Sequence, residues 1–157
     1  LIASIKKQSI TLYINGKSEN QFKMSSSKNR PSCFQDSLGT PNGLHEVCEK
    51  IGGEQPLGMV FEARKPIGKQ YWDCSEEKQS KNLITTRILR LKGLEEGVNC
   101  GGIVDSYNRF IYIHGTNHEE RLGTPASSGC LQLSNSDVLE LFDRLPLKSH
   151  LYIAWDF

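Results

Sequence analysis

The amino-acid sequence predicts a mainly β domain in which a closed or nearly closed mixed β-sheet packs beside one α-helix. Short segments with alternating apolar residues recur along the chain, each bounded by glycine, proline, asparagine or serine. Only residues 135–145 have apolar residues at helical spacing. The 157 residues suit one hydrophobic core, so we expect a single domain over residues 1–157. These patterns do not distinguish a barrel from a sandwich.

The N-terminal segments predict a β-hairpin. Residues 9–14 and 17–24 flank Asn15-Gly16, the dipeptide that best suits a type I′ turn, because both central residues of that turn have positive φ. Residues 25–39 are rich in serine, lysine, asparagine and proline and predict a loop.

The middle of the chain predicts two strands separated by a long polar segment. Residues 59–61 end the first strand and residues 83–91 form the second. Residues 64–82 are polar and predict either a solvated loop or a lid over a binding cleft. We expect Arg87 and Arg90, on opposite faces of the second strand, to be solvated.

The C-terminal part predicts a helix followed by a strand. Ser134 or Asn135 caps the helix and Pro146 ends it. Its expected apolar face consists of Val138, Leu139, Leu141, Phe142 and Leu145. The last strand, residues 150–155, is expected to direct Leu151, Ile153 and Trp155 inward.

Residues 110–114 predict a buried strand that ends in a histidine. Their alternation places Phe110, Tyr112 and His114 on one face, and Ile111 and Ile113 on the other. Cys130 follows Ser-Ser-Gly and precedes an apolar run, where glycine permits a tight turn with amide N–H groups free to face a ligand. A cysteine paired with a histidine is a candidate nucleophile and base, whereas a single cysteine is otherwise a small buried hydrophobe.

Composition limits the other functions. A formal net charge of +1, with both signs interspersed, argues against nucleic-acid or membrane-surface binding, and no stretch approaches the eighteen apolar residues of a membrane span. The odd number of cysteines leaves one thiol over from any full pairing; they are Cys33, Cys48, Cys74, Cys100 and Cys130. Cys100 either pairs with Cys74 or is redox-sensitive. We expect no metal or cofactor, since Cys-x-x-Cys is absent and the His114 and His118 pair adjoins a glycine at a strand end.

Two segments carry a resemblance to a known family. His114-Gly-Thr-Asn is followed by Leu-Gly-Thr-Pro-Ala-Ser-Ser-Gly-Cys130, with sixteen positions from the histidine to the cysteine. This order and spacing resemble the signature of the L,D-transpeptidase (YkuD) family of peptidoglycan enzymes. Residues 40–47, a predicted turn into a strand, resemble the family's Thr-Pro-x-Gly-Phe-x-Ile element, with Leu44 where an aromatic residue is usual. The resemblance implies the same mainly β fold.

The resemblance also implies a reaction on peptidoglycan stem peptides. The Cys130 thiolate attacks the carbonyl of the diamino acid at the third position of a tetrapeptide and forms a thioester as D-alanine leaves. His114 takes the thiol proton and returns it to the leaving amine. The expected supporting residues are Ser128, Gly129 and Cys130, whose amides hold the oxyanion, and Gly115 and Thr116, which orient the imidazole.

Four residues are expected to contact the substrate: Tyr112, Gln132, Arg121 and Trp72. The sequence departs from the family pattern at Ser128, where histidine is frequent, and at Gln132, where arginine is usual. Glutamine is neutral and supplies fewer donors than arginine, so the donor or acceptor preference is expected to differ. Arg109 or Arg121 is a candidate replacement.

Cross-linking by transfer of the acyl group to an amine is the leading hypothesis. The alternatives are an L,D-carboxypeptidase with the same residues, a weakly active or inactive peptidoglycan-binding domain, and an unrelated thiol hydrolase or metal-binding domain. We expect a monomer that is exported to the periplasm or cell envelope. The chain opens at Leu1 with no charged and apolar leader, so the sequence itself gives no export signal.

Overall fold

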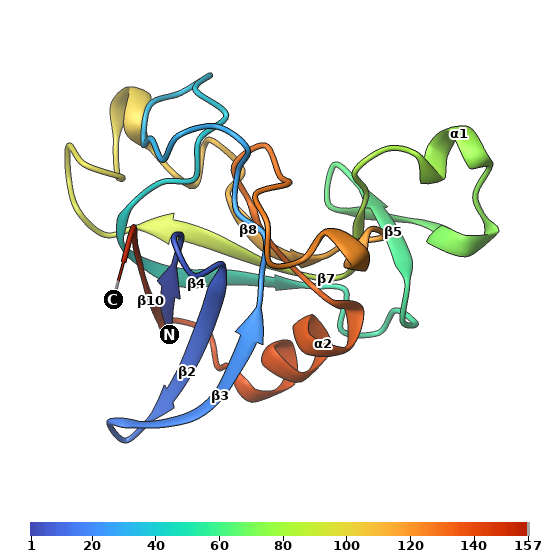
Figure 1. Cartoon of the computed structure of the whole chain (residues 1–157), viewed down its shortest axis with the longest axis horizontal. Helices are drawn as coiled ribbons and strands as arrows, with labels where there is room; N and C mark the ends of the chain where they lie inside the picture. The colour runs from blue at the N-terminus through green and yellow to red at the C-terminus, as the bar shows by residue number, and fades with distance from the viewer. Residues whose placement is uncertain (157) are drawn as a thin grey trace.

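The protein is built on one curled, mixed β-sheet of ten strands within residues 1–156, which the computed structural model describes (Figure 1). The strands are β1 (Ile2–Ser4), β2 (Ser9–Ile14), β3 (Lys17–Lys23), β4 (Gly43–Ile51), β5 (Met59–Glu62), β6 (Lys65–Gln70), β7 (Ile84–Gly93), β8 (Tyr112–Gly115), β9 (Leu131–Leu133) and β10 (His150–Ala154). Their order is β3-β2-β1-β10-β4-β7-β5-β6, and β8 and β9 branch from β7. The β1–β10 and β8–β9 pairs are parallel and the other pairs are antiparallel.

The N-terminal hairpin forms as predicted. β2 and β3 pair in antiparallel register, and the turn residues Asn15 and Gly16 have φ of 51° and 79°. Both values lie in the left-handed region, as a type I′ turn requires.

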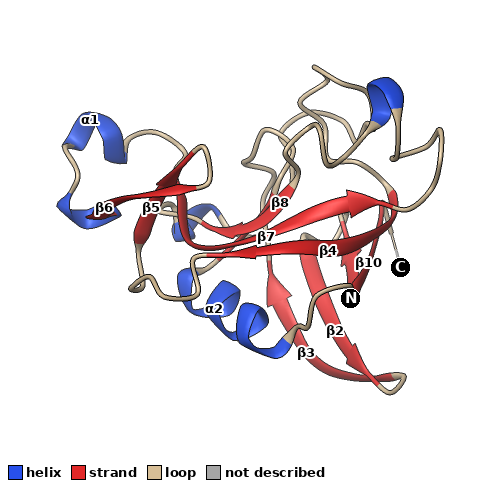
Figure 2. Ribbon diagram, turned by 180° about the vertical axis from the view of Figure 1, so that it is seen from behind, coloured by secondary structure: helices blue, strands red, loops and turns tan. Residues whose placement is uncertain are grey.

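The main helix α2 (Asn135–Arg144) closes the concave side of the sheet, below β7 in Figure 2. The Ser134 side chain accepts a hydrogen bond from the Asp137 amide and so caps the helix. Val138, Leu141 and Phe142 face the core, where they join the inner faces of β2, β4, β7, β8, β9 and β10. The predicted mainly β fold with one packed helix is confirmed, and the sheet curls into a half-barrel.

The polar segment after β5 is folded rather than a simple loop. It contains β6, the 3-10 turn η1 (Tyr71–Asp73) and the one-turn helix α1 (Glu76–Gln79), and it forms a lobe at one end of the sheet (Figure 1). A small cluster of Val60, Cys74 and Leu83 anchors this lobe to the sheet. The two-residue turn of the β5–β6 hairpin is Ala63-Arg64, with φ of 45° and 68°. A non-glycine residue in this conformation costs about 1–2 kcal/mol.

Two further expectations are wrong. Arg87 and Arg90 are both only 6% exposed, because the Gln55 and Tyr107 carbonyls and the carboxylate of Glu49 on β4 supply acceptors to them. Trp155 lies beyond the end of β10 and is 58% exposed, since the strand alternation stops at Ala154. Of the two alternatives for Cys100, pairing with Cys74 does not occur, and all five cysteines are free thiols.

Candidate active site

The parallel strands β8 and β9 bring the predicted pair together. In their register Ile113 lies opposite Leu131, and His114 lies opposite Gln132. The side chains of Ile113 and Leu131 belong to the core. Because side chains alternate along a strand, His114, Gln132 and the residue just before β9, Cys130, share the other face.

His114 is a neutral imidazole. It is 4% exposed, and burial lowers its pKa from 6.5 to about 4. Its Nδ1 lies 2.7 Å from the Gly115 carbonyl oxygen. A carbonyl only accepts, so Nδ1 carries the hydrogen and Nε2 keeps its lone pair for a proton. The predicted orienting role of Gly115 thus rests on its backbone oxygen.

The Cys130 thiol is held between one backbone group of β8 and one of the turn that precedes β8. The Tyr112 amide donates to Sγ over 3.4 Å, and the thiol donates to the Phe110 carbonyl over 3.4 Å. Burial raises the pKa of Cys130 to about 11, against the lowering effects of the Tyr112 amide and of the charged Arg109. The resting site therefore contains a protonated thiol and an unprotonated imidazole.

Cys130 and His114 are neighbours without a direct hydrogen bond in the described part of the chain. Cys130 lies two positions before Gln132, the residue opposite His114. A proton transfer from the thiol to His114 would break the thiol's hydrogen bond to the Phe110 carbonyl.

The turn before Cys130 is organised by Ser127. Its hydroxyl donates to the Cys130 carbonyl over 2.6 Å and accepts from the Gly129 amide over 3.2 Å. Gly129 has φ of 128°, a value that side chains rarely permit, and an added Cβ would lie 3.3 Å from Ile111 Cδ1. Sequence reasoning missed this role of Ser127, although a hydroxyl residue three positions before the cysteine was a usable signal.

Two amides of this turn are candidate oxyanion donors. The Ser128 and Cys130 N–H groups have no hydrogen-bond partner among residues 1–156, whereas the Gly129 amide is occupied by Ser127. Of the predicted amides in residues 128–130, those of Ser128 and Cys130 therefore remain candidates and that of Gly129 does not.

The other predicted residues divide into two groups. Tyr112 and Gln132 lie on the face of the reacting pair. The Thr116 hydroxyl accepts from the His118 amide and does not contact His114.

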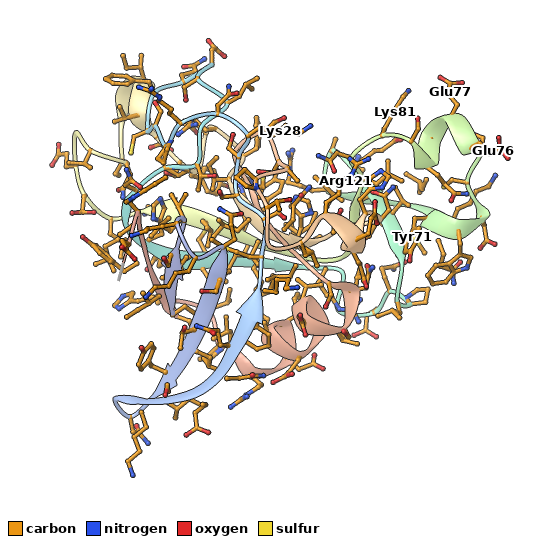
Figure 3. The ribbon with its side chains drawn as sticks, viewed as in Figure 1. Lys28, Tyr71, Glu76, Glu77, Lys81 and Arg121 are labelled. Atoms are coloured by element: carbon orange, nitrogen blue, oxygen red, sulfur yellow. The ribbon has the colours of Figure 1, made fainter. Side chains whose placement is uncertain are left out.

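Arg121, labelled in Figure 3, pairs with Glu120, and Trp72 packs over Gly58 in the lobe. No hydrogen bond, ion pair or ring contact links Arg121 or Trp72 to Cys130 or His114 within residues 1–156.

A hollow of about 230 Å³ adjoins the cysteine turn. It is lined by Gln35, Asp36, Leu38, Asn108, Arg109, Phe110, Ile111 and Ser128. A larger hollow of about 410 Å³, which includes Lys28 and Trp155, has neither Cys130 nor His114 in its lining. We assign the smaller one to the site because its lining includes Phe110, whose carbonyl accepts from the Cys130 thiol, and Ser128, two positions before Cys130.

The fold and this pair define a class of β domains that place a cysteine beside a histidine on adjacent parallel strands of a curled sheet. The model of the YkuD family, described as the L,D-transpeptidase catalytic domain, matches residues 1–153. The chain belongs to the L,D-transpeptidase (YkuD) family.

Individual relatives agree with this assignment. A Bacillus subtilis protein assigned by its name to the L,D-transpeptidases, YqjB, is 40% identical over 48 residues, which are 31% of this chain and 27% of that protein. The structure is similar to an L,D-transpeptidase from Mycobacterium smegmatis, with a TM-score of 0.56 and 17% identity over 98% of this chain and 57% of that one. It is also similar to L,D-transpeptidase 3 from Mycobacterium tuberculosis in complex with a faropenem-derived adduct, with a TM-score of 0.58 and 15% identity over 97% of this chain and 58% of that one.

Proposed function

We propose that residues 1–157 form one catalytic domain of a peptidoglycan L,D-transpeptidase, with Cys130 as nucleophile and His114 as base. The observation that carries the proposal is the placement of the thiol and the Nε2 lone pair on one face of β8 and β9, next to an unoccupied Cys130 amide. The family match supports the same assignment.

The first half-reaction releases D-alanine. The thiol proton moves to His114 Nε2 as Cys130 Sγ bonds to the carbonyl carbon of the third residue of the stem tetrapeptide. The C–N bond to D-alanine then breaks, and the proton on His114 passes to the leaving amine. The donor acyl group remains as a thioester on Cys130.

The second half-reaction transfers this acyl group. An amine of a second stem peptide loses a proton to His114 and attacks the thioester carbonyl, and the C–S bond breaks as the proton returns to sulfur. The product is a cross-link between the two stems. If water attacks in place of the amine, the same residues give an L,D-carboxypeptidase.

Both half-reactions pass through a tetrahedral oxyanion, which the Ser128 and Cys130 amides would bind. Removal of one such donor costs about 3 kcal/mol of transition-state stabilisation in well-studied enzymes. The Ser127 hydroxyl fixes the direction of these amides through its bonds on either side of Gly129.

The family assignment also bears on location and partners. Members of this family act at the cell envelope, and we propose that the protein is exported and acts there as a monomer on peptidoglycan. Within residues 1–156 no helix is both long and apolar enough to cross a membrane. The chain spans about three-fifths of the solved relatives, so the activity of a longer protein belongs to the proposal as well.

The test is mass spectrometry of purified disaccharide-tetrapeptide incubated with the protein, beside Cys130→Ala. Loss of D-alanine together with a dimer supports transpeptidation, and loss without a dimer supports the carboxypeptidase. No loss from several stem types, together with no carbapenem adduct on Cys130, would contradict the enzyme and favour a peptidoglycan-binding domain.

A further inference from the structure

The tip of the β5–β6 hairpin carries an arginine in a conformation that the turn alone does not favour. Glu62 pairs with Lys65, so Ala63 and Arg64 are the two central residues of the turn, and both have positive φ. The same chain uses Asn15-Gly16 at its other two-residue hairpin turn, which is the less strained choice. Backbone strain retained at one position directs attention to the function of its side chain.

The Arg64 side chain reaches the two residues that hold the reacting sulfur. Its Nη1 donates to the Tyr112 hydroxyl over 3.2 Å, and its guanidinium lies 4.9 Å from the centre of the Phe110 ring. The backbone groups of Tyr112 and Phe110 each lie 3.4 Å from Cys130 Sγ. The guanidinium therefore contacts the side chains of the two residues whose backbone groups hold the Cys130 thiol.

Arg64 also has donors to spare. Guanidinium carries five N–H donors, and Arg64 donates to Tyr112 alone, without an ion pair to a carboxylate in residues 1–156. Arg109 already donates to three acceptors, Ser32 O, Ser37 Oγ and Gly39 O. Arg90, the other guanidinium near Phe110, is paired with Glu49.

We propose that Arg64 binds a carboxylate of the donor stem peptide and thereby positions that donor over Cys130. The inference rests on the proposed function and specifies its substrate, since Gln132 offers no charge beside His114. A planar carboxylate matches the guanidinium fork and takes a bidentate pair. Two donor carboxylates have this chemistry: the side-chain carboxylate of a diamino acid such as diaminopimelate at position three, and the terminal carboxylate of D-alanine.

The test combines protein variants with substrate variants. The substrates are a tetrapeptide with diaminopimelate at position three, the same peptide with that side-chain carboxyl amidated, the same peptide with its D-alanine carboxyl amidated, and a peptide with both amidated. The proteins are wild type, Arg64→Gln, Arg64→Lys and the double variant Ala63→Asn/Arg64→Gly, which installs the turn used at residues 15 and 16. The readouts are kcat/KM for D-alanine or D-alaninamide release and the thermal midpoint.

We expect Arg64→Gln to lower kcat/KM on the unmodified peptide by about 10–100-fold, the range of a charge-assisted hydrogen bond. On the peptide that lacks the recognised carboxylate, we expect wild type and Arg64→Gln to agree within about twofold, because nothing is left for the guanidinium to bind. Arg64→Lys should fall between them, since it keeps the charge and loses the fork.

The double variant separates recognition from stability. Ala63→Asn/Arg64→Gly should lose activity like Arg64→Gln while its thermal midpoint rises by about 2–4 °C, because the turn strain is relieved. A purely structural role for Arg64 would lower the midpoint and reduce activity on all four peptides alike.

The substrate arms identify which carboxylate is bound. If amidation at position three removes the effect of Arg64→Gln, Arg64 binds the diamino acid. If amidation of D-alanine removes that effect, Arg64 binds the leaving group. An equal effect of Arg64→Gln on all four peptides, or no effect on any, overturns the inference while the proposed function stands. Failure of wild type to release D-alanine or its amide from every peptide overturns the proposed function, and the inference falls with it.

Discussion

Two buried histidines make stability depend on pH between neutrality and pH 4. Burial lowers the pKa of His45 and of His114 from 6.5 to about 4. His45 is fully buried on β4 and bonds the Gly43 carbonyl and the Ser106 hydroxyl through its two ring nitrogens. In the unfolded chain both imidazoles bind a proton near pH 6.5, whereas in the folded protein both stay neutral until about pH 4.

The size of the effect follows from this difference. Because the unfolded state binds more protons, the free energy of unfolding rises with pH in this window. The stability is complete above pH 6.5 and is lost as pH falls toward 4. From pH 7 to pH 5 each imidazole removes about 2 kcal/mol, or about 4 kcal/mol together. Typical domains have about 5–15 kcal/mol in total, so the loss is large.

The assay is urea unfolding followed by circular dichroism at pH 7 and pH 5. The proteins are wild type, His45→Gln, His114→Gln and the double variant, since glutamine is neutral at both values and can still donate and accept. We expect wild type to lose about 4 kcal/mol, each single variant about 2 kcal/mol, and the double variant little. An undiminished loss in the double variant would refute the reasoning, because other groups would then carry the pH dependence.

The remaining predictions concern the cysteine turn. Cys130→Ala should abolish D-alanine release and carbapenem adduct formation with a nearly unchanged thermal midpoint, and a marked loss of stability with retained turnover would instead indicate a structural thiol. Ser127→Ala removes the hydroxyl between Gly129 and Cys130, so it should lower stability by about 1–2 kcal/mol and turnover by about 10-fold or more, measured by denaturant unfolding and steady-state kinetics. Gly129→Ala places a Cβ against Ile111 at φ of 128° and should cost about 1–3 kcal/mol; a neutral result in the same unfolding assay would show that the turn can relax.

Local signals predicted the elements that local forces determine. The Asn15-Gly16 turn fixes its hairpin through its own backbone preferences, and the Ser134 cap marks the start of α2. The alternation in residues 112–114 correctly separated the core face of β8 from the face of Tyr112 and His114, whereas Phe110, predicted in the same strand, lies in the turn before it with φ of 56°. The strand register that aligns His114 with Gln132 was not predictable, because it depends on segments that meet only in the folded sheet.

The errors have one physical origin, which is the contribution of distant residues. Residues 64–82 looked like a loop because β6 has little apolar content, and it forms only by pairing with β5. Arg87 and Arg90 looked like surface residues, but acceptors from residues 49–55 and from Tyr107 allow both to be buried. Arg64 reaches the site from a hairpin whose closeness to Phe110 no local pattern reveals.

Gln132, a neutral residue where the family pattern has arginine, lies opposite His114. Two unit charges roughly 6 Å apart repel by about 3 kcal/mol at an effective dielectric of about 20, so an arginine here would oppose a protonated His114. That repulsion would act when the imidazole takes the thiol proton, and burial already lowers the pKa of His114 to about 4. With Gln132 the imidazolium avoids this second penalty. The positive charge that binds a donor carboxylate then has to come from another residue. The half-buried Arg64, which contacts Tyr112 and Phe110, supplies this charge without repelling a protonated His114.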